Sequence, residues 1–143
     1  MKKVLILLAA FCLSVAAQAQ TGSKVATTKK LKVVFHLTSS DTTVQKSMAK
    51  QLNNFLNAAP NAKVEVVCHN SGISFLHKAK TKFADKVHDL SARGVDFVAC
   101  ENTMRDRNIK REELVDECRT VPAGVVEVVM KQNKGWAYVR ATQ

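Results

Sequence analysis

Hydrophobic residues follow two patterns along this chain. Four short runs are apolar almost without a break and rich in β-branched residues, which favours strands buried on both faces. These runs predict strands at 31–37, 64–68, 95–99 and 136–140. Between them, apolar residues recur every three or four positions, which predicts helices at 44–59, 81–93, 110–118 and 121–130. Strands and helices that alternate in this way predict a layered α/β sandwich with a parallel sheet.

The segment 121–130 fits two kinds of element. Its many valines favour a strand. Pro122 at a first-turn position and the polar residues that follow at 131–134 favour a helix. The valines at 125, 126 and 129 also share one helical face, so we predict a helix here.

The N-terminus has the pattern of a secretory signal peptide. Lys2 and Lys3 precede an apolar core that is too short to span a membrane, and Ala17-Gln18-Ala19 is a small-x-small cleavage site. We therefore expect a signal peptide at 1–19, cleavage after Ala19, and a periplasmic or secreted protein. Residues 20–30 are polar and predict a flexible lead-in, and 31–143 form a single domain. No later segment predicts a membrane span.

Charge and glycine content exclude several classes of protein. The chain has 22 basic and 12 acidic side chains, a net charge of +10, but its basic residues are scattered and only 6% of residues are aromatic. This pattern disfavours nucleic-acid binding and suits a solvated basic surface. Neither GxGxxG nor GxxxxGK occurs, so no nucleotide cofactor is expected. No His or Cys pair has the tight spacing of a zinc motif, so no metal is expected either.

Three of the predicted strands end in residues that can carry chemistry. These are His36, Cys68-His69 and Cys100, and open α/β sheets bind ligands at the carboxyl ends of their strands. The common strand order 2-1-3 would put the strand of His36 between the two thiols, about 10 Å apart. That separation is too wide for a relaxed disulfide, so both thiols are predicted to be unpaired.

Cys100 is the strongest single candidate. It ends a predicted strand and precedes a polar helix start, where backbone N–H groups favour a thiolate. We expect this thiol to be open to solvent. The alternative is a buried, inert cysteine, which is the commoner case among free cysteines.

Residues around Cys100 could assist it. His36 and His69 stand at neighbouring strand ends, although a histidine satisfied by backbone hydrogen bonds is the commoner case for His36. Asn102 and Thr103 could cap the next helix or orient a substrate. Arg105, with Arg107, could bind an anionic sulfur species. The helix start at 122–124 could approach the same edge of the sheet and bind an anion.

Four stretches of the chain, in order, resemble one known family. They are VVFH at 33–36, VVCHNSGI at 66–73, GVDFVACENTM at 94–104 and VPAGVVE at 121–127. The sequence from 32 to 140 is similar to the DsrE/DsrF-like family, in its stand-alone, exported branch. The resemblance implies a flavodoxin-like three-layer sandwich with a central five-stranded, mainly parallel sheet. It also implies a homo-oligomer, either a dimer, a trimer or a hexamer.

The resemblance also implies a function. Sulfur-relay relatives carry a persulfide on a cysteine at this strand end, which corresponds to Cys100. His36, His69, Asn102 and Thr103 match family positions near the same cleft. The first hypothesis is therefore a periplasmic sulfur carrier that exchanges sulfur with a thiol-bearing partner protein and needs no turnover of its own. The alternative is a non-catalytic oligomeric module that binds a small anion or a metal at the strand ends.

Overall fold

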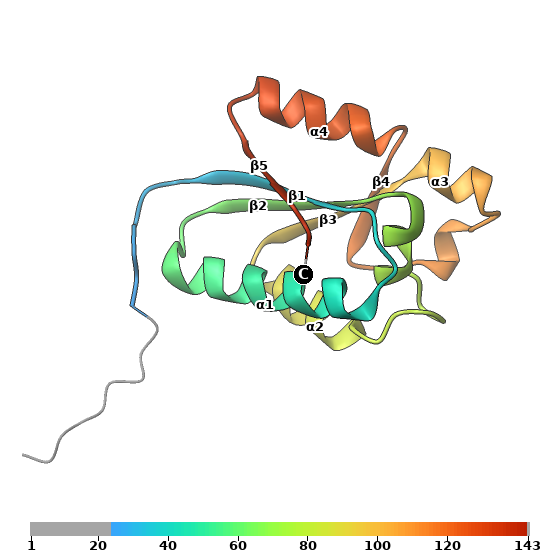
Figure 1. The fold of residues 1–143 in the computed structure, drawn as a ribbon, viewed down its shortest axis with the longest axis horizontal. Coiled ribbons are helices and arrows are strands. Elements are labelled where there is room, and N and C mark those ends of the chain that lie inside the picture. The colour runs from blue at the N-terminus through green and yellow to red at the C-terminus, as the bar shows by residue number, and fades with distance from the viewer. Residues whose placement is uncertain (1–23, 143) are drawn as a thin grey trace, which may run out of the picture.

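The fold is a parallel five-stranded sheet with helices on both faces. The computed structural model describes residues 24–142, so the predicted signal peptide lies outside the described residues. All strand pairs are parallel, and the order across the sheet is β4-β3-β2-β1-β5 (Figure 1). The strands are β1 (Lys32–Leu37), β2 (Lys63–Cys68), β3 (Val95–Cys100), β4 (Cys118–Val121) and β5 (Ala137–Arg140). The predicted α/β sandwich with a parallel sheet is confirmed.

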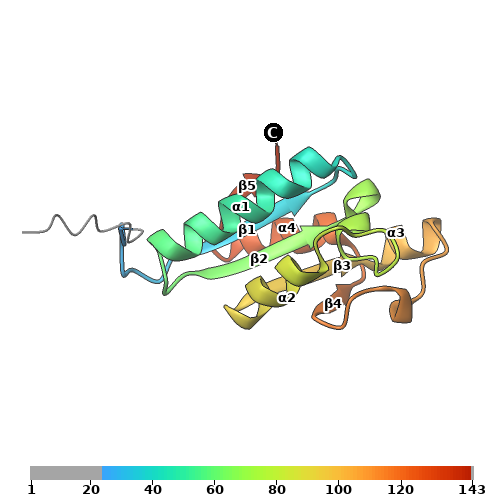
Figure 2. The same cartoon turned by 90° about the horizontal axis from the view of Figure 1, so that it is seen from below.

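The direction of each crossover decides which face a helix covers. The helices are α1 (Thr42–Ala58), α2 (Ala84–Ala92), α3 (Glu101–Asp106) and α4 (Gly124–Asn133), with 3₁₀ turns η1 (Asn70–Phe75) and η2 (Arg111–Glu113). Parallel crossovers are right-handed. The steps from β1 to β2 to β3 run in one direction and place α1 and α2 on one face. The step from β4 back to β5 runs the other way and places α4 on the opposite face (Figures 1 and 2).

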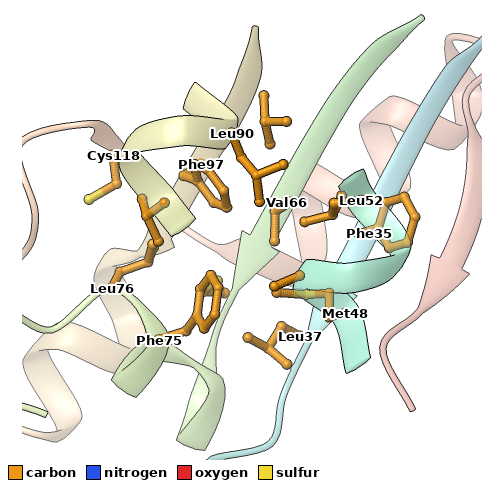
Figure 3. Close-up of a cluster of buried hydrophobic side chains, with 14 of the residues drawn as sticks. Phe35, Leu37, Met48, Leu52, Val66, Phe75, Leu76, Leu90, Phe97 and Cys118 are labelled. Atoms are coloured by element: carbon orange, nitrogen blue, oxygen red, sulfur yellow. The ribbon is translucent and has the colours of Figure 1, made fainter. Parts of the chain in front are cut away.

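The face under α1 and α2 holds the main apolar core. Side chains at alternate strand positions point to this face, among them Phe35, Val66 and Phe97, and they meet the apolar stripe of α1 (Figure 3). Met48 and Leu52 of that stripe are fully buried. The helix begins where the sequence predicts a cap, because Asp41 Oδ1 accepts a hydrogen bond of 2.7 Å from the N–H of Thr43.

The opposite face has a much smaller apolar cluster. Val34, Val67, Val98 and Val121 from the strands pack against Val128 of α4. The partly buried Trp136, which lies between α4 and β5, also joins this cluster.

The structure corrects the prediction of a helix at 110–118. Only the single turn η2 forms there, and Cys118 begins the short edge strand β4. The Arg111 side chain donates to the carbonyls of Val115 (3.2 Å) and Cys118 (2.5 Å), which satisfies backbone groups that a helix would have paired. A strand of four residues, with its second residue exposed, leaves too little alternation to be recognised in the sequence.

The strand order also differs from the 2-1-3 order used above. In the structure β2 lies between β1 and β3, whereas the 2-1-3 order would place β1 in the middle. The second crossover continues in the direction of the first, and periodicity does not encode that direction.

The chain before β1 is hydrogen-bonded to the end of α1. The N–H groups of Ala26 and Thr27 both donate to the carbonyl of Ala58, at 2.8 and 3.1 Å, and thereby satisfy the end of α1. Within this part of the chain, no helix has the length and apolarity that a bilayer crossing requires.

Candidate functional site

A cleft opens where the chain leaves two neighbouring strands toward opposite faces. After β3 the chain enters α3, whose Met104 packs against the core of the α1 and α2 face. After β4 it enters α4 on the other face (Figure 1). Ligands of parallel α/β sheets bind at such a divergence. The cleft measures about 550 Å³ and is lined by His69, Asn70, Cys100, Asn102, Thr103, Asp106, Arg107, Ala123, Gly124 and Val125.

Cys100 lies at the floor of this cleft. The residue is only 4% exposed, so its thiol is less open to solvent than the sequence led us to expect. Burial is the largest single influence on its pKa and acts to raise it. Hydrogen bonds from the Gly124 N–H, from Thr103 and from the Asn102 N–H together outweigh burial and hold the pKa of Cys100 below its ordinary value of 9.0. The cleft therefore favours the thiolate, which is the nucleophilic form.

The N–H of Gly124 makes the contact that links α4 to the thiol. It donates to Cys100 Sγ at 3.2 Å. A Cβ atom on residue 124 would lie 3.2 Å from the Cβ atoms of Cys100 and His69 and from Cγ1 of Val67. These contacts are tighter than ordinary packing, so a side chain at this position would push the helix start and the sheet apart by a few tenths of an ångström. The helix start predicted at 122–124 does reach the thiol.

The two strand-end histidines form a stacked pair. The rings of His36 and His69 lie 4.6 Å apart with an interplanar angle of 20°. Nδ1 of His36 lies 3.1 Å from the hydroxyl of Tyr138. Burial, with a smaller effect of His69, lowers the pKa of His36 to about 4, and burial also lowers the pKa of His69. His69 lines the cleft, whereas His36 stands behind it.

Each of these histidines keeps one ring nitrogen without a partner. The Nε2 atoms of His36 and His69 are buried, and neither has a hydrogen-bond partner within residues 24–142. The lowered pKa values keep both rings neutral near pH 7, and each ring holds unused donor or acceptor capacity, that of His69 at the cleft.

Arg107, and not Arg105, supplies the positive charge of the cleft. Its Nη2 donates to Asn70 Oδ1 at 2.7 Å and to Ser71 Oγ at 3.2 Å. The guanidinium of Arg105 instead bonds to Asn102 Oδ1 and lines a separate hollow beyond α3. Arg105 lies in α3, whereas Arg107 follows the last residue of that helix, and the two side chains point in different directions.

Asn102 and Thr103 both line the cleft. Thr103 is 6% exposed, and its Oγ1 accepts a hydrogen bond of 2.9 Å from the N–H of Asn70. The N–H of Asn102 donates to the carbonyl of Pro122 at 3.3 Å. These bonds join α3 to η1 and to the start of α4, so the cleft is closed by hydrogen bonds on two sides.

The other two cysteines differ from Cys100 in the face of the sheet they occupy and in the direction of their pKa shift. Cys68 and Cys118 belong to the apolar core on the opposite face, and burial raises the pKa of both thiols. All three cysteines of the described residues are unpaired, which confirms the prediction for Cys68 and Cys100. The reason is different: Cys68 pairs in register with Ala99, so its side chain and that of Cys100 leave the sheet on opposite faces.

Sequence reasoning missed one buried charge. Glu65 in the middle of β2 is fully buried and lies among Arg119, Lys131 and Glu127 beneath α4. The signal was a single acidic residue in an otherwise apolar strand, where a carboxylate is costly unless it is paired.

The described residues offer no cluster of ligands for a metal ion. Within 24–142, no three His, Cys, Asp or Glu side chains converge in the way that a metal site needs. His36 and His69 face one another by stacking, and Cys100 takes its hydrogen bonds from backbone and hydroxyl groups.

The fold and the cleft define a class: parallel α/β proteins with a thiol at a strand end, stabilised as thiolate by a following helix. The DsrE/DsrF-like family model matches residues 15–141, and the chain belongs to this family, which is associated with sulfur transfer. The chain is also similar to a solved protein of unknown function, MTH1491 from Methanobacterium thermoautotrophicum. The two share 29% identity and a TM-score of 0.75, over 78% of this chain and 99% of that one. No curated protein matches the sequence.

Proposed function

We propose that the protein is a sulfur carrier that holds a persulfide on Cys100. The observation that carries this proposal is the hydrogen bond of 3.2 Å from the Gly124 N–H to Cys100 Sγ, at the floor of an open cleft. A thiol that is held below its ordinary pKa, and that also faces a cleft, has both the reactive form and the access that sulfur exchange requires.

The exchange is a balanced displacement at sulfur. The Cys100 thiolate attacks the outer sulfur of a donor persulfide, R–S–SH, or of a polysulfide. One S–S bond forms, giving Cys100–S–SH, as the donor S–S bond breaks and R–S⁻ leaves. A partner thiolate then attacks the outer sulfur of Cys100–S–SH and restores the Cys100 thiolate. Neither step needs an external oxidant or reductant.

The cleft suits a small anionic sulfur species. Arg107 provides a guanidinium at its wall, and the N–H groups at the start of α4 point toward it. The same groups support the alternative function, a module that binds a small anion without chemistry at Cys100. The two functions differ in whether the thiol gains sulfur.

We further propose that the protein acts outside the cytoplasm and as a homo-oligomer. Export rests on the signal pattern at 1–19. Assembly is supported by the outer surface of α4, where Val125, Val126, Val129 and Met130 are each between 45% and 55% exposed. Four large apolar side chains that cluster on one helix face indicate a contact surface. Val125 also lines the cleft, so a second copy on this face would border the thiol.

Mass measurement after incubation with polysulfide tests the proposal. We expect the mature protein to gain one sulfur atom, and Cys100→Ser to gain none. Cys68→Ser and Cys118→Ser serve as matched controls and should gain sulfur like the wild type. A wild type that gains no sulfur, but binds sulfite or thiosulfate in the cleft, would favour the anion-binding module instead.

A further inference from the structure

A fully buried carboxylate lies in the middle of β2, away from the thiol. The side chain of Glu65 has no exposed area, and strand alternation points it to the face under α4. Its neighbour on β1 is Val34, which is apolar. A carboxylate at such a position destabilises the fold unless other groups compensate for its lost hydration.

The two compensating cations come from α4 and from β4. Lys131 Nζ bonds to Glu65 Oε2, and Arg119 Nη2 of β4 reaches the same oxygen at 3.0 Å. Arg119 also bonds to Glu127 of α4 at 3.2 Å and to Asp96 of β3 at 3.0 Å. These four residues are the charged groups that face Glu65 from the elements around it. Glu65 Oε1 has no partner within residues 24–142.

Few other contacts hold α4 on the sheet. Gly124 and Val128 are its only buried residues within the described chain, and four of its large apolar side chains face outward. The helix is therefore held at Gly124 by the thiol, at Val128 by the small apolar cluster, and about one turn beyond Val128 by the charges around Glu65. Seven positions separate Gly124 from Lys131, about 10 Å along a helix that moves as a rigid rod.

We propose that Glu65 is a positioning residue for Cys100: by binding Lys131 and Arg119 beneath α4, it seats the helix so that the Gly124 N–H reaches the thiolate. This inference rests on the proposed function only in treating that thiolate as the reacting group. The ionised form of Glu65 holds both cations, so α4 is held most firmly against the sheet when Glu65 is charged. Burial raises the pKa of Glu65 to about 7, so this hold weakens as the pH falls through neutrality.

Positioning and direct electrostatics predict opposite signs for the substitution Glu65→Gln. Asp96 pairs with Glu65 and precedes Cys100 by four residues, which separates the carboxylate from the thiol by roughly 13 Å along the sheet. Removing a negative charge at that distance would lower the thiol pKa slightly, since like charges disfavour the thiolate. Loosening the helix would raise the thiol pKa, because the Gly124 N–H would move away from Sγ.

The test is the rate of Cys100 alkylation by iodoacetamide as a function of pH, in the Cys68→Ser/Cys118→Ser background. For Glu65→Gln we expect a raised thiol pKa and a rate about three- to tenfold lower at pH values below it, the net size of one typical hydrogen bond. Asp96→Asn is the matched control. It removes a carboxylate from the neighbouring strand that contacts Arg119 but not α4, and should leave the thiol pKa unchanged or slightly lower. An unchanged or lowered thiol pKa in Glu65→Gln would overturn the proposal.

A second measurement needs no substitution at Glu65. Trp136 is the chain's single tryptophan, and Lys131 Nζ lies 4.5 Å from the centre of its ring. Its emission should therefore follow the titration of Glu65. Coupling between two sites is reciprocal, so alkylation of Cys100, which removes the thiolate, should move the Trp136 midpoint to higher pH. Identical midpoints before and after alkylation would refute the coupling. Neither measurement reads sulfur uptake, so both stand even if the carrier function fails.

Discussion

The two faces of the sheet are built from the same strands but differ in almost every physical property. Odd-numbered positions of β1, among them Phe35 and Leu37, point into a large apolar core under α1 and α2 (Figure 3). Even-numbered positions point to α4 and include His36 on β1 and Cys100 on β3. Cys68 on β2 points to the core face, although the next residue, His69, lines the cleft.

This difference shows how one sheet can separate stability from chemistry. The core face has two helices, many buried side chains and thiols whose pKa is raised. The α4 face has one helix, a small apolar cluster, buried charge and a thiol whose pKa is lowered. Regions with few apolar contacts can move at lower cost. We expect damage to the core face to change stability, and damage to the α4 face to change thiol chemistry.

The largest expected effect is a loss of stability from the core face alone. Phe97 of β3 is fully buried and lies in the cluster of Figure 3. Phe97→Ala should lower the free energy of unfolding by about 3–5 kcal/mol, because a large cavity replaces the ring. Urea denaturation gives this value. The alkylation profile of Cys100 in the folded variant should match the wild type. A shifted thiol pKa would mean that the two faces are not separable.

The amino acid pattern was sufficient to predict the strands that are buried on both faces. β1, β2 and β3 are apolar runs with few polar interruptions, and α1 has a clear stripe with a capping Asp41. β4 was missed because it is a short edge strand. The order of the strands could not be predicted, because it depends on the direction of each crossover, which no local pattern records.

The site was predicted only in part, for a similar reason. Cys100, His69, Asn102 and Thr103 were found because they stand at strand ends or at a helix start, and they do line the cleft. Arg107 could not be chosen over Arg105 before the orientation of α3 was known. Glu65 lies mid-strand, and its partners are 54 and 66 residues away in the chain, so its role depends on how α4 crosses the sheet.

The next largest effect is expected at the start of α4, where one substitution should change both the stability of the fold and the pKa of Cys100. Gly124→Ala places a Cβ atom 3.2 Å from the Cβ atoms of Cys100 and His69. The helix must shift outward, which should cost about 1–3 kcal/mol as overpacking does. The same shift should raise the thiol pKa and slow alkylation near neutral pH. Gly94→Ala is the control: nothing lies within 4 Å of its Cβ position, and its φ of +90° makes the substitution costly through backbone strain alone. It should leave the thiol pKa unchanged; equal thiol profiles in the two variants would refute the close approach of α4.

The histidine pair on the α4 face should make the free energy of unfolding depend on pH. Burial lowers the pKa of His36 from 6.5 to about 4. Between these values the unfolded chain binds more protons than the folded protein, so stability falls as the pH falls from 6.5 toward 4. His36→Gln should remove about 1–2 kcal/mol of this loss, after allowance for partial exposure of the ring. Denaturation at a series of pH values measures it.

His88 provides a control of opposite sign for that experiment. It is exposed and hydrogen-bonded to Glu117, which raises its pKa. Its contribution is present at low pH and is lost as the pH rises through its folded value. His88→Gln should therefore make the acid-induced loss slightly steeper, whereas His36→Gln makes it shallower. Glu65 titrates in the same range with a raised pKa, and its contribution cancels when each variant is compared with the wild type.

The smallest expected effect on folding tests the outer surface of α4. Val126 is 55% exposed, so Val126→Lys should change the stability of a single copy by no more than about 0.5 kcal/mol. If copies of the chain associate through this surface, the buried charge should abolish the assembly, because a lysine without a partner is costly in an apolar contact. Sedimentation velocity compares the two proteins at equal concentration. Gln51→Lys adds the same charge to the exposed side of α1 and should leave the sedimentation coefficient unchanged. If the Val126→Lys variant is still an oligomer with unchanged sedimentation, the contact between copies lies on another surface. No second copy would then cover the outer surface of α4, and the cleft would be open to solvent beside Val125.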